Sequence, residues 1–318
     1  MSSMSIEKIL EKKKDITHLS NYRTPAKTEY FFEVNCRHDV DRIFDIKSFC
    51  DSQKLPFMII GGGTNMLFDF DVYPWVIVKN NLRGWTYNMD SKILESKSQE
   101  KIWHIARILE EDDGQAIWHR FIGLPGSIGG AVYGNAGCFG LEIEGNFLSA
   151  QVLDLQSWEI QTFTKEDMEF SYRNSRLKKQ PQRYFLISVI FDLSENREKY
   201  SSSVDNIYFR EHQQPKGNSC GSFFKNPSID REVFIAQFPH LKAVAPERLS
   251  AGFLIEQVWL KWYQLGGASF SSLHANFLIH NGQGTHQDLM KLLRLAQQKV
   301  QDTFGIELEN EVQIITIK

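Results

Sequence analysis

Apolar and polar positions follow clear periods in the N-terminal part of the chain. The run YFFEV at residues 30–34 is apolar and β-rich, which predicts a strand. Residues 39–53 follow a helical period and predict a helix that buries four side chains: Ile43, Phe44, Ile46 and Phe49. A further apolar run, FMII at 57–60, predicts a strand that leads directly into the glycines of GGGTN.

From about residue 145 to residue 193 the pattern becomes that of a sheet. The stretches FLSAQVLDL, EIQTFT and YFLISVIFDL either alternate or run apolar, with β-branched content typical of strands. The polar stretch that follows, residues 194–206, predicts a connection between two folding units.

The C-terminal third predicts helices and strands in turn. ERLSAGFLIEQVWL is helical in pattern and HANFLIH is strand-like. A long amphipathic helix is expected from His286 to Phe304, with Thr285 as its N-cap, Asp288 completing a capping box and Gly305 ending it. Its apolar stripe indicates core packing. The last stretch, LENEVQIITI, predicts a strand with Glu309 and Glu311 on one face.

Composition narrows the class of protein. The 318 residues are 42% hydrophobic and 24% charged, which suits a globular chain of two or three folding units. A net charge of -3 argues against a nucleic-acid partner. The cluster Lys12, Lys13 and Lys14 is more typical of a solvent-exposed helix face than of a phosphate-binding patch.

The cysteines and the absence of long apolar runs point to the cytoplasm. Cys36, Cys50, Cys138 and Cys220 show neither the spacing of a zinc site nor a disulfide framework, so reduced thiols and no metal are expected. No secretory signal begins the chain, and no apolar run reaches the length of a membrane span. We therefore expect a soluble cytoplasmic protein without a membrane partner.

Two glycine-rich segments are the first candidates for a binding site. In GGGTN, a strand enters three glycines whose backbone amides could approach an anion closely, although a triple glycine can also be only a sharp turn. The second segment, residues 123–140, has seven glycines in 18 residues. It predicts packed, non-helical backbone presented to a ligand, or simply a tightly turned sheet corner.

Together the two segments favour a large nucleotide-type cofactor. Neither matches the GxGxxG of a dinucleotide-binding strand-to-helix turn or the GxxxxGK[ST] of a P-loop. A third candidate is the loop GNSCGSFFKNP, residues 217–227, which places a hydroxyl, an ammonium and a carboxamide close together among turn residues. Its serine could equally be a turn hydroxyl that caps its own backbone.

The motifs, taken in order along the chain, resemble one family. GGGTN, GLPGSIGGAVYGNAG, SYRNS, GSFFKNP, AGFLIEQ followed by LK, HANF and LENEV are similar to the UDP-N-acetylenolpyruvoylglucosamine reductases, also called UDP-N-acetylmuramate dehydrogenases. The resemblance extends from about Asn21 to Val312, and GSFFKNP is its most specific part. GGGTN and GLPGSIGG alone would indicate only the wider vanillyl-alcohol-oxidase-type flavin fold.

The resemblance implies an α+β fold with a vanillyl-alcohol-oxidase-type FAD-binding lobe of two subdomains and a C-terminal α/β substrate-binding domain. The expected boundaries are 15–200 for the FAD-binding domain, 201–306 for the substrate-binding domain, and 307–318 for a terminal strand that returns to the flavin lobe. Only 48 residues separate Arg173 from Ser222, which resembles the shorter subtype that lacks an inserted tyrosine loop.

The implied activity is that of an FAD-dependent oxidoreductase of peptidoglycan synthesis. The family reduces UDP-N-acetylglucosamine enolpyruvate to UDP-N-acetylmuramate with NADPH, a step needed for the cell wall, cell shape and cell division. FAD and NADPH are the implied cofactors, and the partners are small molecules. A monomer is favoured over an oligomer.

The resemblance also assigns site residues. Ser222 would deliver a proton to the carbanion that hydride addition leaves, and Arg173 and Glu311 would polarise the substrate carboxylate. Without the motifs, Arg173 could be a surface cation and Glu311 the exposed side of an edge strand. Tyr172, Lys225, Asn226 and Lys261 would bind substrate, with Lys225 also able to assist Ser222; Lys261 could instead be a snorkelling surface lysine. The residues expected around FAD are Gly61, Gly62, Gly63, Thr64, Asn65, Gly126, Ser127, Gly129 and Gly130.

Three substitutions and one longer stretch depart from the family pattern. Gln213 stands where some members have a diphosphate-binding lysine, Trp262 where glycine is usual, and Asn310 where proline is usual. The stretch QAIWHRFIGLPG also lacks the usual glycine and acidic residues. These changes bear on substrate affinity more than on reaction type, because no catalytic residue is lost.

Two other functions remain open from the sequence. An FAD-linked oxidase of the same fold would act on an alcohol and pass electrons to oxygen, without need of NADPH. A flavin-binding scaffold without activity is also conceivable, although Ser222 and Glu311 are both retained.

Overall fold

The structure, a computed structural model, describes residues 6–194 and 203–317. The chain divides into two compact units, and the division is not a single cut in the sequence. The first unit holds Met1–Asp15, Lys27–Gly63 and Val72–Arg210. The second unit holds Ile16–Ala26, Thr64–Asp71 and Glu211–Lys318. The domain boundaries expected from the sequence stay a prediction.

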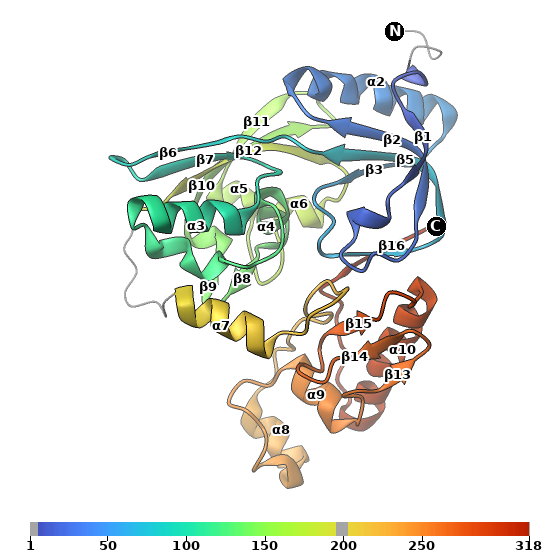
Figure 1. The fold of residues 1–318 in the computed structure, drawn as a ribbon, viewed down its shortest axis with the longest axis vertical. Helices are drawn as coiled ribbons and strands as arrows, with labels where there is room; N and C mark the ends of the chain where they lie inside the picture. Colours follow the sequence, from blue (N-terminus) through green and yellow to red (C-terminus); the bar gives the residue numbers. More distant parts are fainter. Residues whose placement is uncertain (1–5, 195–202, 318) are drawn as a thin grey trace. The chain divides into compact units, whose positions relative to one another are not determined.

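A four-stranded sheet opens the first unit, in the order β1-β2-β5-β3. Its strands are β1 (Glu11–Asp15), β2 (Lys27–Val34), β3 (Phe57–Ile60) and β5 (Val72–Asn80). β5 is parallel to both of its neighbours, whereas β1 runs antiparallel at the edge. The predicted helix is α2 (Arg37–Gln53), which lies across the sheet (Figure 1).

Two expectations for this region are wrong. The three lysines Lys12–Lys14 lie on strand β1, not on a helix. Lys12 and Lys13 are exposed, as expected, and Lys14 is partly exposed. Phe44 is 49% exposed rather than buried, because it lies outside the stripe of α2 that faces the sheet. Its ring meets the ring of Trp158 edge to face, with centroids 4.8 Å apart.

The second sheet of the first unit is antiparallel throughout, in the order β11-β10-β12-β7-β6. Its strands are β6 (Trp85–Asn88), β7 (Ile93–Lys97), β10 (Phe147–Asp154), β11 (Ile160–Thr164) and β12 (Tyr184–Asp192), so the three strands predicted there are confirmed. The helices around it are α3 (Ile102–Asp113), η2 (Ala116–Phe121), η3 (Ile143–Gly145), α5 (Lys165–Met168) and α6 (Arg176–Lys179). Trp118 and Phe191 pack edge to face in its core.

The second glycine-rich segment contains a helix, contrary to expectation. α4 (Ile128–Gly134) forms because Ser127 caps its N-terminus, with the Ser127 side chain accepting a hydrogen bond from the Gly130 amide at 3.2 Å. Asn135 ends α4 in the left-handed conformation. The two short strands β8 (Gly137–Cys138) and β9 (Leu141–Glu142) follow as a hairpin. Two good caps therefore outweigh the low helix propensity of three glycines.

Helix α7 (Ser203–Gln213) carries the chain from the first unit to the second. The predicted connection at 194–206 falls largely on residues 195–202, which lie outside the described residues, and its last four residues are helical. Among the residues that the structure describes, no helix is both long and apolar enough to cross a membrane.

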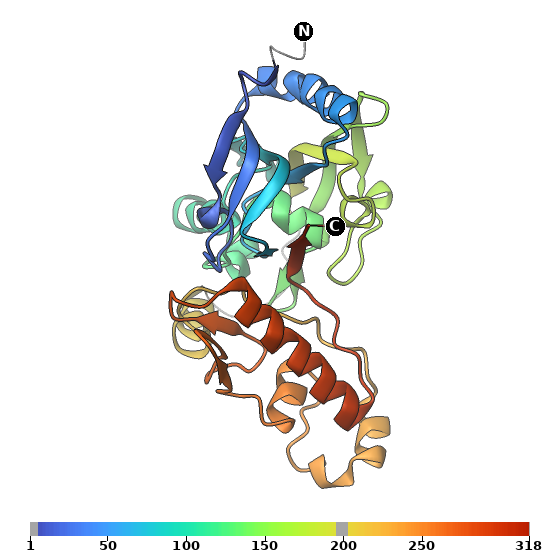
Figure 2. The ribbon, with the colours of Figure 1, turned by 90° about the vertical axis from the view of Figure 1, so that its right-hand side faces the viewer.

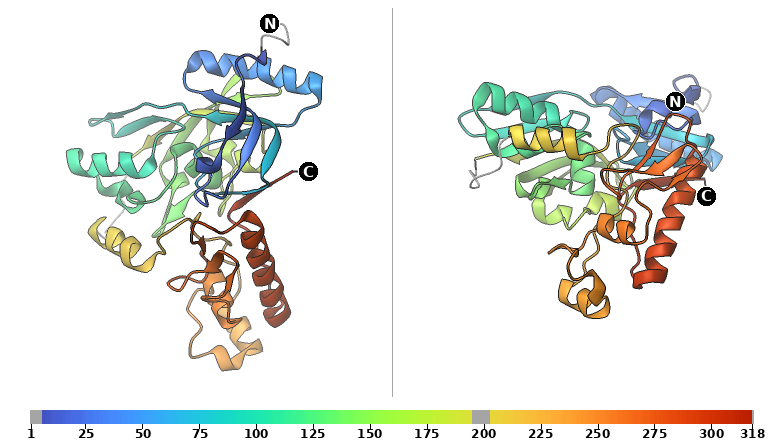
Figure 3. Two further views of the ribbon diagram at one scale, coloured as in Figure 1. Left: turned by 45° about the vertical axis from the view of Figure 1, so that its right-hand side comes forward. Right: turned by 60° about the horizontal axis from the view of Figure 1, so that its bottom comes forward.

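The second unit is built around the long helix α10 (His286–Phe304). This helix has the predicted bounds, and its capping box of Thr285 and Asp288 and its left-handed Gly305 are confirmed. It packs beside the antiparallel sheet of β13 (Gln264–Leu265), β14 (Ala268–Phe270) and β15 (Leu278–His280) in both views of Figure 3. The remaining short helices are η1 (Thr17–Leu19), α8 (Arg231–Gln237), η4 (Pro239–Leu241) and α9 (Ala251–Gln257).

The last strand differs from the prediction in its bounds. After α10 the chain returns along the helix to β16 (Gln313–Thr316), which pairs in parallel with β4 (Met66–Asp69) (Figure 2). Glu309 and Glu311 precede this strand, so the predicted strand face that would carry both is wrong. Their segment pairs instead with the serine-containing loop, through the bridge between Phe224 and Asn310.

Candidate active site

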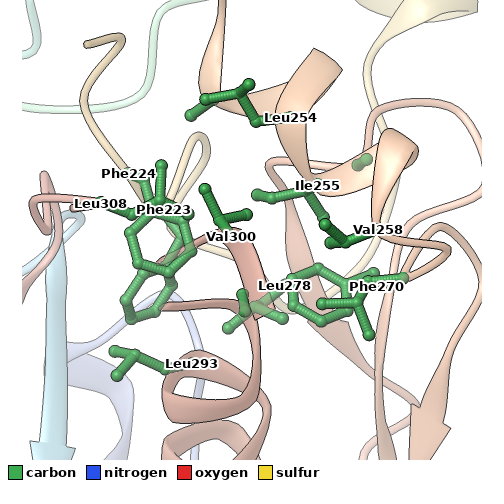
Figure 4. Close-up of a cluster of buried hydrophobic side chains, with 14 of the residues drawn as sticks. Phe223, Phe224, Leu254, Ile255, Val258, Phe270, Leu278, Leu293, Val300 and Leu308 are labelled. Carbon is green, nitrogen blue, oxygen red and sulfur yellow. The ribbon is translucent and has the colours of Figure 1, made fainter. Parts of the chain in front are cut away.

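The loop GNSCGSFFKNP belongs to the second unit and is held there by its two phenylalanines. Phe223 and Phe224 are 0% and 1% exposed. They enter the apolar cluster that also includes Leu293, Val300 and Leu308 (Figure 4). Burying two aromatic side chains contributes several kcal/mol. The loop is therefore anchored directly after Ser222, on the C-terminal side of the residue that carries the hydroxyl.

The structure places the backbone of Glu311 beside this loop. The amides of Glu311 and Val312 both donate to the Phe223 carbonyl, at 2.8 and 3.2 Å. The side-chain amide of Asn65 donates to the Glu311 carbonyl at 3.1 Å, and the Asn65 carbonyl accepts from Gln313 at 3.0 Å. The predicted proton donor, the predicted acid and Asn65 are thus neighbours within the second unit.

Lys225 and Asn226 follow in the same loop, and both are engaged. The Lys225 ammonium lies 2.8 Å from a carboxylate oxygen of Glu309, and the Lys225 amide donates to the Glu309 carbonyl at 2.9 Å. The predicted assistance of Ser222 by Lys225 therefore competes with this ion pair. The Asn226 side-chain oxygen accepts from the amide of Ala251, the first residue of α9, at 3.1 Å. The oxygen of this side chain is thus used within the second unit.

Lys261 follows the end of α9 and forms an ion pair with Glu256. Burial lowers the pKa of His274 and Lys261 adds to this effect, whereas Glu256 acts in the opposite direction. Lys261 is flanked by Trp259 and Trp262, which have positive φ and are 88% and 68% exposed. Lys261 is thus held in place by a carboxylate, unlike a freely snorkelling lysine.

In the first unit the two glycine-rich segments come together. A Cβ built on Gly61 or on Gly62 would lie 3.8 Å from the Ser127 hydroxyl, and one on Gly62 would lie 3.4 Å from the Gln99 amide nitrogen. Gly63 has φ +67°, which favours glycine. Within the described residues, no protein acceptor bonds the backbone amides of Gly61, Gly62 or Gly63. Open amides in a glycine turn suit the pyrophosphate of a dinucleotide, so these residues fit FAD.

The second segment approaches the sheet closely at Gly129. The Gly129 amide donates to the Ser98 carbonyl at 2.7 Å, and a Cβ at Gly129 would lie 2.9 Å from that carbonyl oxygen. Gly126 has φ +138°, and Ser127 uses its hydroxyl as the cap of α4. Glycine is therefore required at residue 129 by close approach and at residue 126 by its conformation.

Arg173 is fixed in the first unit in a left-handed conformation, with φ +55°. Its guanidinium donates to the Gly137 carbonyl at 3.0 Å and lies over the Tyr172 ring, 5.0 Å from the centroid. Glu142 is close by: burial and the neighbouring Glu144 raise the pKa of Glu142, and Arg173 opposes this rise. Arg173 is thus oriented by a backbone carbonyl and by an aromatic ring.

The predicted site residues form two groups, one in each unit. The first unit holds Gly61, Gly62, Gly63, Gly126, Ser127, Gly129, Gly130, Tyr172 and Arg173. The second unit holds Thr64, Asn65, Ser222, Lys225, Asn226, Lys261 and Glu311. Within the described part of the chain, no group of three or more side chains could hold a metal ion.

Sequence reasoning missed Asn276 and Glu309 as neighbours of the site. Asn276 belongs to the motif HANF, which predicts only a strand-like stretch, and Glu309 is read there as part of the last strand. Nothing in the local pattern indicates that they contact the serine-containing loop, because both contacts join segments far apart in the sequence. Only their positions in the motifs HANF and LENEV could have indicated that Asn276 and Glu309 are neighbours of the site.

Comparisons with known proteins show which family this chain belongs to. Residues 213–315 match the family model "UDP-N-acetylenolpyruvoylglucosamine reductase, C-terminal domain". The chain is 32% identical over 300 residues to the UDP-N-acetylenolpyruvoylglucosamine reductase of Protochlamydia amoebophila, with 92% of this chain and 88% of the relative covered. It is also 32% identical to the enzyme of that name from Bacillus pumilus, over 87% of this chain and 85% of the relative.

A solved structure has the same fold. The UDP-N-acetylenolpyruvylglucosamine reductase of Thermus caldophilus superimposes with a TM-score of 0.69 and 20% identity, covering 96% of this chain and 99% of that one. The predicted α+β fold, with a vanillyl-alcohol-oxidase-type FAD-binding lobe and a C-terminal domain, is confirmed. On the extent and level of this identity, the chain belongs to the UDP-N-acetylenolpyruvoylglucosamine reductase family.

Proposed function

We propose that this protein reduces UDP-N-acetylglucosamine enolpyruvate to UDP-N-acetylmuramate in peptidoglycan precursor synthesis. Family membership over nearly the whole chain is the observation that carries this proposal. The enzyme is an FAD-dependent oxidoreductase that uses NADPH. When bound, FAD would supply the hydride-transfer chemistry that links NADPH to the methylene carbon of the enolpyruvyl group.

Ser222 is the proton donor in this proposal. Hydride addition leaves negative charge on the carbon that bears the carboxylate, and the reaction ends when that carbon receives a proton. The Ser222 hydroxyl can give this proton only if its position is fixed, since geometry is the first requirement of a general acid. Burial of Phe223 and Phe224 on its C-terminal side supports that role.

Arg173 and Glu311 stabilise the charge that develops. A planar guanidinium can donate two parallel hydrogen bonds to a carboxylate, which makes Arg173 suited to the substrate carboxylate. Glu311 would act on the same carboxylate in its protonated form, because only then can it donate. Arg173 belongs to the first unit and Glu311 to the second, and both roles are part of the proposal.

The glycine-rich segments hold FAD. The amides of Gly61–Gly63 suit its pyrophosphate, and the resemblance adds the second segment at Gly126, Ser127, Gly129 and Gly130. We include Thr64 and Asn65 because they continue the same turn, with Asn65 also bonded to the Glu311 carbonyl. The side chain of Ser127 is used to cap α4, so its contribution would come from backbone groups.

Tyr172, Lys225, Asn226 and Lys261 bind the nucleotide part of the substrate in this account. Asn226 is the best placed of them, since its oxygen is held by Ala251 and its amide nitrogen can donate to a phosphate oxygen. Lys225 and Lys261 are each paired with a glutamate, yet an ammonium has three donors and can keep its partner while it binds a phosphate. We further propose a cytoplasmic, monomeric enzyme.

Anaerobic stopped-flow absorbance tests the function. Flavin in the loaded protein is first reduced with NADPH and then mixed with UDP-N-acetylglucosamine enolpyruvate without oxygen. Rapid return of the oxidised flavin spectrum, with UDP-N-acetylmuramate as product, is the expected result. A flavin that stays reduced with this substrate but reoxidises promptly in air would contradict the proposal and indicate an oxidase.

A further inference from the structure

Asn276 is a buried amide at the base of the serine-containing loop. It lies between β14 and β15 and is 2% exposed. Its side-chain oxygen accepts from the Phe224 amide at 2.9 Å, and its side-chain nitrogen donates to the Phe224 carbonyl at 2.8 Å. Its own carbonyl accepts from the Phe223 amide at 2.7 Å. One residue thus makes three hydrogen bonds to the two residues that follow Ser222.

The carboxamide of Asn276 fits both polar groups of Phe224 without a change in protonation. One atom must accept and the other must donate, and the two partners fix which way the amide is turned. A leucine would offer neither group, and an ionised aspartate could accept but not donate. Because Phe224 is buried, an unmatched amide or carbonyl there would cost about 1–3 kcal/mol.

The opposite side of the loop is bonded to the segment of Glu311. The Phe223 carbonyl accepts from the amides of Glu311 and Val312, while the Phe223 amide donates to Asn276. Phe223 therefore lies between Asn276 and Glu311, and Ser222 is the residue next to it. Any shift of this short stretch would move the Ser222 hydroxyl relative to the backbone of Glu311.

Asn276 is itself fixed by its neighbours. Its amide donates to the His274 ring at 3.2 Å, and the Phe277 amide donates to the His274 carbonyl at 3.0 Å. Helix α9 closes the other side, since a Cβ at Gly252 would lie 3.2 Å from the His274 ring and 3.7 Å from the Asn276 Cβ. The backbone at residue 276 is held by a tight turn with a helix behind it. It therefore cannot move to replace the two side-chain hydrogen bonds to Phe224 when the side chain is truncated.

We infer that Asn276 is a positioning residue for proton transfer, one that holds Phe223 and Phe224 so that Ser222 is presented next to Glu311. The inference rests on the proposed function, in which Ser222 gives the proton. A misplacement of about 1 Å at a reacting group can cost on the order of 100-fold in rate. The role is distinct from binding, because Asn276 faces the loop backbone and not a ligand.

The test compares the two half-reactions of FAD-loaded variants. For Asn276→Ala we expect reoxidation by the enolpyruvyl substrate to slow by about 10- to 100-fold, while reduction by NADPH stays within about twofold of the wild type. Asn146→Ala is the matched control, because Asn146 is also buried and bonds Trp118 and Asp192 within the first unit. This control should leave both half-reactions unchanged.

Asn276→Asp gives a second signature. A protonated aspartic acid can accept from the Phe224 amide and donate to the Phe224 carbonyl, as asparagine does, whereas the ionised form cannot donate. Burial raises the pKa of such a carboxyl. We expect reoxidation in this variant to be near wild type at low pH and to fall as pH rises through that pKa. The NADPH half-reaction should show no such new pH dependence.

A double variant and amide hydrogen exchange complete the test. If Asn276 acts through Ser222, Ser222→Ala with Asn276→Ala should be no slower than Ser222→Ala alone. In the Asn276→Ala protein, amides of residues 222–226 should exchange faster than in the wild type. Equal slowing of both half-reactions, an additive double variant, or unchanged exchange would overturn the inference. Exchange needs no activity, so it still tests the hydrogen bonds if the proposed function fails.

Discussion

The glycine-rich segment of the first unit and the serine-containing loop of the second unit are shaped in different ways. At Gly129 and Gly137 an added Cβ would lie 2.9 and 2.8 Å from neighbouring atoms. The segment can therefore pack as it does only because these residues have no side chain. At Gly217 and Gly221 nothing lies within 4 Å of an added Cβ. The loop is instead held by side chains from distant segments, above all Asn276.

This difference explains which part of the site is visible in the sequence. A segment shaped by close approach must be rich in glycine, and that richness can be read directly. The partners that hold the serine-containing loop carry no such mark, because they lie more than 50 residues away from it in the sequence. The glycine-rich segment should therefore tolerate few larger side chains. The serine-containing loop should tolerate few truncations of the side chains that hold it.

The largest expected effect is that of Gly129→Ala. The added methyl would meet the Ser98 carbonyl at 2.9 Å, and relieving this overlap should cost about 1–3 kcal/mol of unfolding free energy. We also expect a lower flavin content, because α4 and the backbone before it would shift. Urea denaturation and the ratio of flavin to protein absorbance measure the two effects.

Gly134→Ala is the control at the other end of α4. An added Cβ there has nothing within 4 Å, and alanine is a better helix former than glycine. This variant should keep its flavin and be as stable as the wild type or up to about 1 kcal/mol more stable. Equal damage by both substitutions would mean that close approach at residue 129 does not shape the segment.

A smaller effect is expected when the loop loses a donor but keeps its shape. Asn226→Asp retains an oxygen for the Ala251 amide yet replaces the NH2 group with negative charge. We expect UDP to bind about tenfold more weakly or worse, with unfolding free energy nearly unchanged. Calorimetric titration with UDP measures the affinity.

Asn226→Ala separates the two roles of this side chain. It removes the acceptor as well, so it should lose stability in addition to affinity, by about 1 kcal/mol. If Asn226→Asp binds UDP as well as the wild type, Asn226 holds α9 and does not contact the substrate.

A still smaller effect concerns two tryptophans at positive φ, Trp262 in the second unit and Trp158 in the first. Trp262 has φ +69° and is largely exposed, so Trp262→Gly should relieve backbone strain with little lost packing. A gain of about 0.5 kcal/mol is expected after the entropy cost of glycine. Trp158 has φ +61° but packs on Phe44, and Trp158→Gly should therefore destabilise the first unit. Chemical denaturation of both variants decides whether packing makes the difference.

The weakest expected effect is on thiol reactivity, with no change in activity. Burial raises the pKa of Cys220 in the loop to about 12. Burial also raises the pKa of Cys138 in the glycine-rich segment, but Arg210, Arg173 and Arg120 act in the opposite direction. Because the thiolate is the reactive form, iodoacetamide should modify Cys138 faster than Cys220 in the folded protein, and both more slowly than exposed Cys36. Mass spectrometry of timed samples gives the three rates.

Regular elements with strong local signals could be predicted from the sequence. The helix from His286 to Phe304 has its caps and its apolar stripe in one stretch, and the structure has these bounds. Helix α4 could not be predicted, since its two caps outweigh glycines that argue against a helix. The pairing of residues 309–312 with the serine-containing loop also escaped prediction, because it depends on tertiary contact and not on alternation.

The candidate site was predictable as a set of motifs but not as an arrangement. Ser222, Glu311 and Asn65 lie close together because three separate segments meet in the second unit. Their roles come from the family resemblance, and their proximity comes from the structure. The pairing of Lys225 with Glu309 has no local signal at all, since the partners are 84 residues apart.

The central claim is that Ser222 gives the proton that completes the reaction. Its most direct test is the reoxidation half-reaction of Ser222→Ala, measured by anaerobic stopped-flow with UDP-N-acetylglucosamine enolpyruvate after reduction by NADPH. We expect reduction by NADPH to be unchanged and reoxidation to slow by about 100-fold or more, as is typical of a lost general acid. Reoxidation within about threefold of the wild-type rate would contradict the account.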